Sequence, residues 1–377
     1  MNVHSEIRLS AYSYAMPPER EKRSHMSRWA KPEFSKKQVN LAGKILVSPE
    51  EYPEDDYAWA LGVISNFRSI HGHPLNTFQT TLRIKGRHVD KNIIVAQRVK
   101  RLSSIHLKLS RFNTMTLSQM QDIGGCRAVV TSVDEVNALV QSYIKSDLKH
   151  KLHTHDDYML NPKPTGYRGV HLIYRYYSDK IDTYNSLKIE MQFRSQYQHA
   201  WATAVEIVGI FTKQALKSSQ GEEDWLRFFS LMGGAIAAIE GTQPVPGVPE
   251  DPESLRNELN DAADRLDAVN RLRTYGTAPQ ILEQPQAKGN HFFLLELDAA
   301  EMKLNIRGYK AQDLEDASDD YLEAEKRFAQ EAAGGDAVLV SVESLAALRR
   351  AYPNYYLDTD MFVGLVEDVL SGSMPLI

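Results

Sequence analysis

The sequence predicts an α+β protein, with a mixed sheet flanked by helices and a small C-terminal ββαβα unit. Two observations carry this prediction. Strand-like and helix-like segments alternate between residues 124 and 211. A proline-rich segment at 241–253 then separates them from a second run of strands and helices. The chain of 377 residues is long enough for two domains at roughly 150 residues each.

Periodicity defines the first run. "GGCRAVVTS" and "GVHLIYRYY" are predicted strands, and "VDEVNALVQSYIKS" between them is a predicted amphipathic helix. The next strand, "SLKIEMQFRS", alternates strictly, so its apolar side chains face one way and its polar side chains the other. The polar row is either an ordinary solvated face or the floor of a site for metal and phosphates. It consists of Lys188, Glu190, Gln192 and Arg194.

The helix "SQYQHAWATAVEIVGIF" follows this strand. Ser195 as N-cap and Gln198 three residues later form a predicted capping box. Trp201 and Val205 are spaced to face the core, whereas His199 continues the polar row of the strand. The helix should therefore carry part of the same site.

Four parts are predicted along the chain. A basic, loosely packed or mobile arm covers 1–44, and a first folded domain covers 45–240, beginning with an amphipathic helix around 52–71. A proline-rich linker and one helix cover 241–275, and a C-terminal domain covers 276–377. The last part contains no residue set that suggests catalysis, so it is predicted to be regulatory.

Composition excludes several protein classes. The single cysteine, Cys126, excludes a disulfide framework and a cysteine-bound zinc site. No apolar run reaches the roughly 18 to 20 residues that span a bilayer, and the N-terminus lacks the apolar segment of a signal peptide. We therefore expect a soluble, cytoplasmic protein with no membrane partner.

Charge is distributed unevenly. The net charge is -5, but residues 250–377 contain 12 Lys and Arg against 25 Asp and Glu, which leaves residues 1–249 with +8. Residues 81–112 hold nine Lys and Arg and one acid. This stretch is either a phosphate-seeking surface, with Arg83, Lys85 and Arg87 as candidate RNA contacts, or a solvated basic helix.

Two carboxylates are candidates for a metal site. Asp122 lies just before a strand in "MQDIGGCRAVV", where a capping role is the alternative, and Glu190 lies in the alternating strand. Mg²⁺ that handles nucleotide phosphates takes one or two carboxylates together with substrate oxygens. Asp122 and Glu190 are therefore the predicted metal-binding and catalytic pair.

Cations and an aromatic residue lie in two further segments. "RVKRLSSIHLK" has steps of four that place Lys100, Ser104 and Lys108 on one helical face, where they could clamp a triphosphate. In "DDYMLNPKPTGYRGVH" a tyrosine after glycine can stack on a nucleobase or pack on the sheet edge. The candidate residues of that turn are Lys163, Tyr167, Arg168 and His171. The cluster "HTHDD" at 153–157 is interpreted as a polar turn and not as a metal site.

Together these motifs resemble the synthetase domain of the RelA/SpoT alarmone enzymes over about residues 95–210. The resemblance implies transfer of the β,γ-pyrophosphate of ATP to a ribose 3′-hydroxyl. It implies that Asp122 and Glu190 hold Mg²⁺, that Glu190 deprotonates the acceptor and that Tyr167 stacks on the acceptor base. The implied ATP-binding residues are Arg98, Lys100, Ser104 and Lys108. Those lining the acceptor site are Gln192, Arg194 and His199.

The fused C-terminal part resembles that of the CapRel toxin and antitoxin fusions, although it lacks cysteines for a zinc finger. This resemblance implies a toxin that pyrophosphorylates the 3′-CCA end of tRNA, held inactive in cis and released by a phage protein such as the major capsid protein. Tyr352, Tyr355 and Tyr356 offer apolar area for the inhibitory contact, or form the core of the C-terminal unit. The alternatives are synthesis of ppGpp or ppApp from a free nucleotide and a non-catalytic RNA-binding module.

Overall fold

The structure is a computed structural model. It describes residues 29–212, 223–276, 279–283, 290–298, 301–330, 335–342 and 345–376. Residues 1–28 of the predicted N-terminal arm lie outside the described residues.

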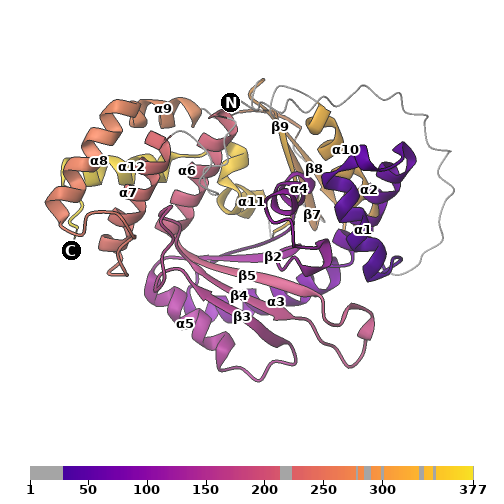
Figure 1. The fold of residues 1–377 in the computed structure, drawn as a ribbon. Helices are drawn as coiled ribbons and strands as arrows, with labels where there is room; N and C mark the ends of the chain where they lie inside the picture. The colour runs from indigo at the N-terminus through magenta and orange to yellow at the C-terminus, as the bar shows by residue number, and fades with distance from the viewer. Residues whose placement is uncertain are drawn as a thin grey trace.

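A single nine-stranded mixed sheet organises the described part of the chain (Figure 1). The strand order is β3-β4-β5-β2-β1-β9-β7-β8-β6. The pairs β2 with β5 and β6 with β8 are parallel, and the remaining pairs are antiparallel. The α+β class with a mixed sheet and flanking helices is therefore confirmed. The strands are β1 Ile94–Val99, β2 Gly124–Val130, β3 Lys151–Asp157, β4 Val170–Arg175, β5 Lys188–Ser195, β6 Gln280–Glu283, β7 Phe292–Asp298, β8 Lys303–Tyr309 and β9 Gly335–Ser341.

The alternation of β5 separates two faces of the sheet. Ile189, Met191 and Phe193 are buried in a core formed with α3 (Gly72–Val89) and α5 (Val133–Ile144). The polar row of β5 therefore faces away from α3 and α5, toward the side where α6 (Gln196–Thr212) begins. The predicted capping box of α6 is confirmed, since the Gln198 amide donates to Ser195 Oγ and the Ser195 amide donates to Gln198 Oε1, both at 3.2 Å.

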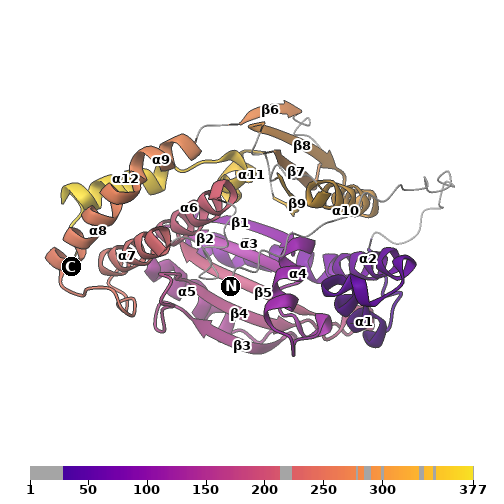
Figure 2. The same cartoon turned by 45° about the horizontal axis from the view of Figure 1, so that its top comes forward.

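Helices from residues 196–275 and the C-terminal helix pack together beside the sheet, as Figure 2 shows from a second direction. The core shared by α6, α7 (Glu223–Ile239), α8 (Pro252–Leu266), α9 (Ala268–Tyr275) and the C-terminal α12 (Asp360–Ser371) includes Trp225, Leu259 and Phe362. One helix was predicted where α8 and α9 lie. Two form because Asp267 adopts a left-handed conformation with φ of 50°.

A second helical group lies at the opposite end of the molecule from α7, α8 and α9 (Figure 2). It consists of α1 (Lys36–Val47), α2 (Glu54–Ser69) and α4 (Leu102–Arg111), which share a buried core. Ile45 and Ile64 are fully packed in this core. The prediction of a loosely packed or mobile arm through residue 44 is therefore wrong from residue 36 onward, where α1 is capped by Ser35 and buries Val39 and Ala42.

The C-terminal strands and helices are arranged in the order β7, β8, α10 (Leu314–Gln330), β9 and α11 (Leu345–Ala351). They continue the sheet of β1 to β5 because β9 pairs with β1. Two sequence expectations change here. Residues 153–157 belong to the edge strand β3 and not to a turn, because they pair with β4. Strand β1, which joins the two halves, was not anticipated within the basic stretch at 81–112.

In the described residues, no helix combines the length and apolar character needed to cross a membrane.

Candidate active site

The polar row of β5 contains a carboxylate that is held by two neighbours. Glu190 Oε1 lies 3.0 Å from Nδ1 of His171 on β4, and its Oε2 accepts a 2.7 Å hydrogen bond from Gln192. The strand register places these residues together, because His171 pairs with Gln192 and Ile173 pairs with Glu190. His171 and Glu190 side chains are 13% and 14% exposed, so the pair is largely shielded from water.

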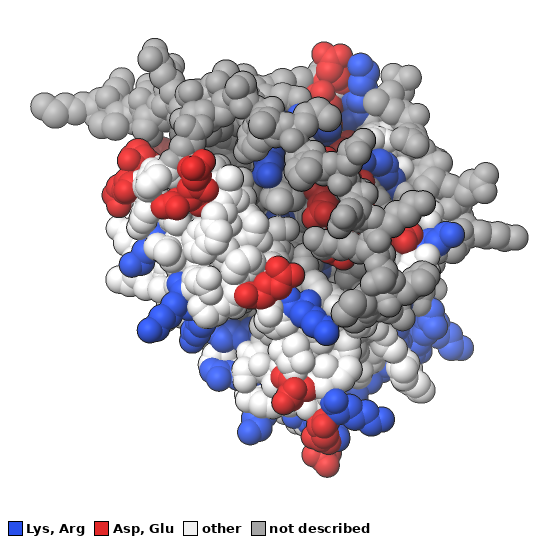
Figure 3. Space-filling view, turned by 90° about the vertical axis from the view of Figure 1, so that its right-hand side faces the viewer, with Lys and Arg blue, Asp and Glu red and all other residues white. Residues whose placement is uncertain are grey.

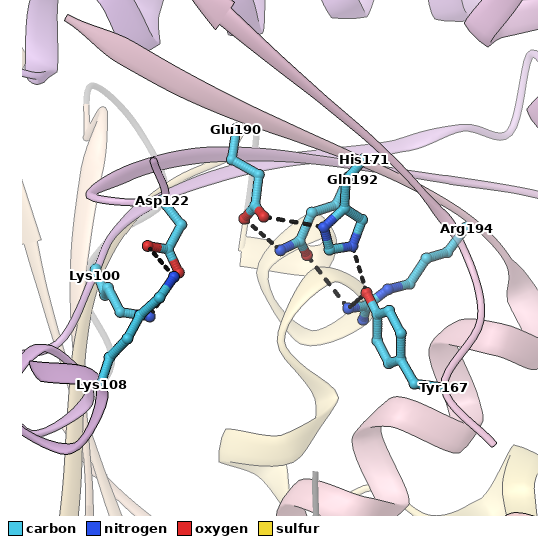
Figure 4. Close-up of polar contacts among 8 residues, drawn as sticks. All are labelled: Lys100, Lys108, Asp122, Tyr167, His171, Glu190, Gln192 and Arg194. Carbon is cyan, nitrogen blue, oxygen red and sulfur yellow. Dashed lines mark hydrogen bonds and ion pairs between the residues drawn. The ribbon is translucent and has the colours of Figure 1, made fainter. Parts of the chain in front are cut away.

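Tyr167 and Arg194 extend this network. The Tyr167 hydroxyl lies 2.6 Å from Nε2 of His171 and accepts a 2.8 Å hydrogen bond from Arg194. Arg194 also donates to Gln192 Oε1 at 3.3 Å. The result is a closed chain of contacts from Glu190 through His171 and Tyr167 to Arg194 and Gln192 (Figure 4).

These contacts set the charges of the network. Burial opposes charging of His171, but Tyr167 and Glu190 outweigh burial and raise its pKa to about 9. Burial would raise the pKa of Glu190, yet His171 and Gln192 hold it well below its usual range. Burial also opposes ionisation of Tyr167, but Arg194 and His171 bring its pKa to about 7. At neutral pH Glu190 is thus ionised and His171 is protonated.

The second predicted carboxylate has cationic partners. Asp122 Oδ2 accepts a 2.8 Å bond from Lys100, and Oδ1 accepts a 3.1 Å bond from Lys108. Burial lowers the pKa of Lys100, partly offset by Asp122. Lys100 lies just after β1 and Lys108 lies on α4, so the carboxylate joins the two ends of the predicted ATP-binding segment. Ser104 lies on the same helix and is partly buried.

The two carboxylate clusters are neighbours on one side of the sheet. Gly125 pairs with Glu190 in the parallel register of β2 and β5, and Asp122 lies just before β2 (Figure 4). A Cβ atom added to Gly125 would stand 3.9 Å from Glu190 Oε2, so glycine keeps the space beside this carboxylate open. Among the described residues, no three His, Cys, Asp or Glu side chains form a metal-binding group. A cation here would therefore need further ligands from its substrate.

The loop that carries Tyr167 rests on α7. Gly166 has φ of +87°, and a Cβ atom added to Gly233 of α7 would lie 2.5 Å from the Cα of Gly166. Ser230 Oγ donates a 2.7 Å hydrogen bond to Pro164 O, and Trp201 Nε1 donates to Phe229 O at 2.8 Å. This support was missed by the sequence reasoning. Its one signal was the adjacent Gly233 and Gly234 within an otherwise apolar helix.

In this conformation Tyr167 packs within the protein. It is 8% exposed, and its ring contacts Tyr158, His171 and Trp201 edge-on. Lys163 lies over the Tyr158 ring at 4.2 Å and over the Tyr167 ring at 5.3 Å. A base could stack on Tyr167 only after the ring or its cover moves.

Two other predicted acceptor residues lie apart from this network. Arg168 is buried and donates to the Thr242 hydroxyl and to Met159 O, which ties the loop to the end of α7. His199 is also buried, with Nε2 3.4 Å from Arg350 O. Burial and the nearby Arg127 lower the pKa of His199 well below its usual value.

Arg98 lies on β1, where the catalytic half of the sheet (β1 to β5) meets the C-terminal half (β6 to β9). Burial lowers its pKa, but Glu206, Tyr352, Tyr355 and Glu190 outweigh burial and raise it. Tyr352 donates a 2.9 Å hydrogen bond to Gln97 O, next to Arg98 on β1. Tyr352 and Tyr355 of the C-terminal half therefore lie near enough to the predicted ATP-binding arginine to affect its charge.

The three predicted tyrosines also belong to the core beneath the C-terminal strands. Tyr355 donates to Asp336 at 2.9 Å, and the Arg349 guanidinium lies 6.0 Å from the Tyr356 ring centre. Of the three, Tyr352 and Tyr355 face the catalytic half through Arg98, whereas Tyr356 packs within its own unit.

The predicted RNA contacts lie on α3, behind the sheet. Lys85 donates to Ser142 O and Ser146 Oγ of the α5 region, at 3.1 and 2.5 Å. Arg83 is partly buried and Arg87 is exposed. The structure thus separates these residues from the polar row of β5. In the view of Figure 3, basic side chains lie on both the upper and the lower parts of the surface, with acidic side chains among them.

Comparison with known proteins finds one family region that matches this chain. Residues 97–211 match the region found in RelA / SpoT proteins. This segment contains both carboxylates, both lysines and the Tyr167 loop, so the resemblance of its motifs is confirmed. GTP pyrophosphokinase YjbM of Bacillus subtilis (strain 168) is 30% identical over 112 residues, which are 29% of this chain and 52% of that protein. The chain therefore spans about half the length of this curated relative.

Two of the solved structures that are similar to this chain are a small alarmone synthetase and a GTP pyrophosphokinase family protein. Small alarmone synthetase 1 from Bacillus subtilis, bound to its product pppGpp, is 22% identical, with a TM-score of 0.38 over 45% of this chain and 90% of that chain. A GTP pyrophosphokinase family protein from Streptococcus pneumoniae is also 22% identical, with a TM-score of 0.37 over 53% of this chain and 92% of that chain.

Proposed function

We propose that this protein transfers the β,γ-pyrophosphate of ATP to the 3′-hydroxyl of a ribose. The single observation that carries the proposal is the ionised Glu190, held by His171 and Gln192 beside an aspartate that is paired with two lysines. Pyrophosphate transfer needs positioning, cations for the phosphate charge and one base for the attacking hydroxyl. The RelA / SpoT match over residues 97–211 supports the same reaction.

The lysines explain how ATP would bind. Asp122 occupies the ammonium groups of Lys100 and Lys108, and phosphate oxygens carry the same charge and hydrogen-bonding capacity as its carboxylate. ATP would take over these lysines, with Arg98 and Ser104 close by in the same segment. Asp122 and Glu190 offer the oxygen ligands that Mg²⁺ prefers, so they would hold the ion, which neutralises phosphate charge when bound.

Glu190 is in a resting arrangement. A carboxylate with a lowered pKa is a weak base, and Glu190 gains its low pKa from His171. Exchange of this ion pair for the acceptor hydroxyl would raise the basicity of Glu190. The buried ring of Tyr167 belongs to the same resting state.

The proposed acceptor is the 3′-CCA end of tRNA, with translation as the process that stops. The net charge of +8 on residues 1–249 supports a polyanionic acceptor. The alternative is a free nucleotide that yields ppGpp or ppApp, favoured by the naming of the curated relative as a GTP pyrophosphokinase. The position of Arg83, Lys85 and Arg87 behind the sheet gives the tRNA proposal no further support.

We also propose that the C-terminal part inhibits the enzyme in cis and that a phage protein, such as a major capsid protein, releases it. The support is the position of Tyr352 and Tyr355 beside Arg98. A partner would shift the equilibrium between the closed and open forms only by the difference between its affinities for the two forms.

The test is incubation of purified full-length protein, with and without the candidate partner, with γ-labelled ATP, total tRNA, GDP and GTP. Label on tRNA supports the proposed acceptor, and label on nucleotide alone supports alarmone synthesis. A protein that binds tRNA and labels neither acceptor, even with the partner present, would be the non-catalytic RNA-binding module.

A further inference from the structure

The sheet has a short seam between its two halves. Strand β1 pairs with β9 through Gln97 with Ser341 and Arg98 with Val340, whereas the pairing of β7 with β9 runs the length of both strands. The side chains of Gln97 and Ser341 are buried at this seam. Within the described residues, Gln97 Oε1 and Ser341 Oγ have no hydrogen-bond partner. Both residues line a cavity between the halves whose lining is mainly apolar, so the seam is short and incompletely satisfied.

A carboxylate on α10, in the C-terminal half, contacts residues on the other side of the same junction. Glu325 Oε2 lies 2.8 Å from Arg68 Nη1 on α2, and its Oε1 accepts a 2.6 Å hydrogen bond from the Leu102 amide. Arg68 and Glu325 side chains are 4% and 7% exposed. Leu102 is the first residue of α4, whose positive N-terminal end favours an anion. Glu325 therefore clamps the helix that carries Ser104 and Lys108.

A second carboxylate of the C-terminal half contacts Arg101, the residue just before Leu102. Asp336, on β9, forms an ion pair with Arg101, which is the N-cap residue of α4. Its Oδ2 also accepts the 2.9 Å hydrogen bond from Tyr355. The two carboxylates thus engage two consecutive residues of the ATP segment, Arg101 and Leu102, which directly follow Lys100.

We infer that Glu325 and Asp336 form an acidic latch that holds the C-terminal half closed on the ATP helix, and that the protein opens at the β1–β9 seam when the latch is released. The inference rests on the proposed function, since it specifies how inhibition of that site is maintained. Buried charge-assisted hydrogen bonds at Glu325 supply the closing contacts. Two buried hydrogen bonds besides the strand pairing also cross the seam, from Tyr352 to Gln97 O and from Gln79 to Ser341 O, so the latch acts together with them.

The experiment compares Glu325→Gln with Glu323→Gln in the full-length protein. Glu323 is exposed on the same helix, so the control removes the same charge without touching the latch. Hydrogen exchange is measured for the amides of residues 94–99 and 335–341, with residues 188–195 as an internal reference. Hydrogen bonds to charged groups predict that Glu325→Gln accelerates seam exchange roughly tenfold to a hundredfold. Glu323→Gln should leave it unchanged.

A second variant guards against misfolding of the first. Asp336→Asn should accelerate exchange at the same amides, again with residues 188–195 protected. Unchanged seam exchange in both variants, or loss of protection throughout the sheet, overturns the latch.

Transfer of label from γ-labelled ATP is measured on the same samples. Faster seam exchange together with increased transfer supports both the latch and the proposed function. Faster seam exchange with no transfer to tRNA, GDP or GTP supports the latch and contradicts the proposed function. If Glu325→Gln instead lowers transfer without opening the seam, Glu325 positions α4 for catalysis and the latch is wrong.

Discussion

The Glu190 carboxylate forms a buried ion pair with His171, 3.0 Å apart, across neighbouring antiparallel strands. Within this pair the Glu190 carboxylate is ionised, and it is already engaged by His171. The proposed base therefore carries the charge that it needs. It must release His171 and bind the acceptor hydroxyl before it can take a proton.

The ion pair predicts how stability depends on pH. Because folding raises the pKa of His171 from 6.5 to about 9, its stabilising effect is fully present below pH 6.5 and is lost as pH rises through about 9. The advantage of the wild type over His171→Gln in free energy of unfolding should thus fall across this window, by at most about 3 kcal/mol. Denaturant unfolding at pH 6, 7.5 and 9.5 measures it. Tyr167, whose pKa is lowered to about 7, titrates in the same window with the opposite sign, so the comparison is also made in a Tyr167→Phe background, where a constant difference would show that His171 is not charged in the folded protein.

The close approach of Gly233 to Gly166 predicts a role in positioning the Tyr167 loop. Gly233→Ala should displace the loop, because the new Cβ would lie 2.5 Å from the Gly166 Cα. Overpacking of this kind costs about 1 to 3 kcal/mol of stability. The KM for the acceptor should rise more than the KM for ATP.

The matched control is Gly62→Ala in α2, where an added Cβ meets nothing within 4 Å. This change should be neutral or stabilise the protein by up to about 1 kcal/mol. Equal effects of Gly62→Ala and Gly233→Ala on the acceptor KM would contradict the positioning role.

Salt should distinguish the two acceptors. A tRNA held through several phosphates releases counterions on binding, so transfer to tRNA should fall steeply between about 50 and 200 mM salt. Transfer to GDP should change much less over the same range. Initial rates at subsaturating acceptor measure both, and parallel salt curves would favour a nucleotide-sized contact and the alarmone alternative.

Much of the catalytic half could be predicted because its signals are local. The alternation of β5, the apolar spacing of α5 and the capping box of Ser195 with Gln198 each lie within a few neighbouring residues. The candidate carboxylates and lysines were also found from such motifs, and the structure brings Asp122 together with Lys100 and Lys108.

The remaining features depend on contacts between distant segments. Nothing near Arg168 indicates that it binds Thr242, and nothing near Glu325 indicates that it reaches the start of α4. The basic stretch around Lys85 looked like one surface, but β1 divides it and α3 turns Lys85 toward α5.

Helix α12 packs among α6 to α9, so cutting the chain near residue 275 would remove part of a core shared with the catalytic half. Point variants are therefore better tests of inhibition than this truncation.

The most direct test of the account is the rate of pyrophosphate transfer by Glu190→Gln. The measurement uses γ-labelled ATP and the preferred acceptor, in the Glu325→Gln background if the intact protein is inactive, with ATP binding measured in parallel. Glutamine keeps the shape of the side chain and removes its charge and basicity, so we predict a loss on the order of 10²- to 10⁴-fold with ATP binding retained. A folded Glu190→Gln protein with near-normal turnover would contradict the central claim.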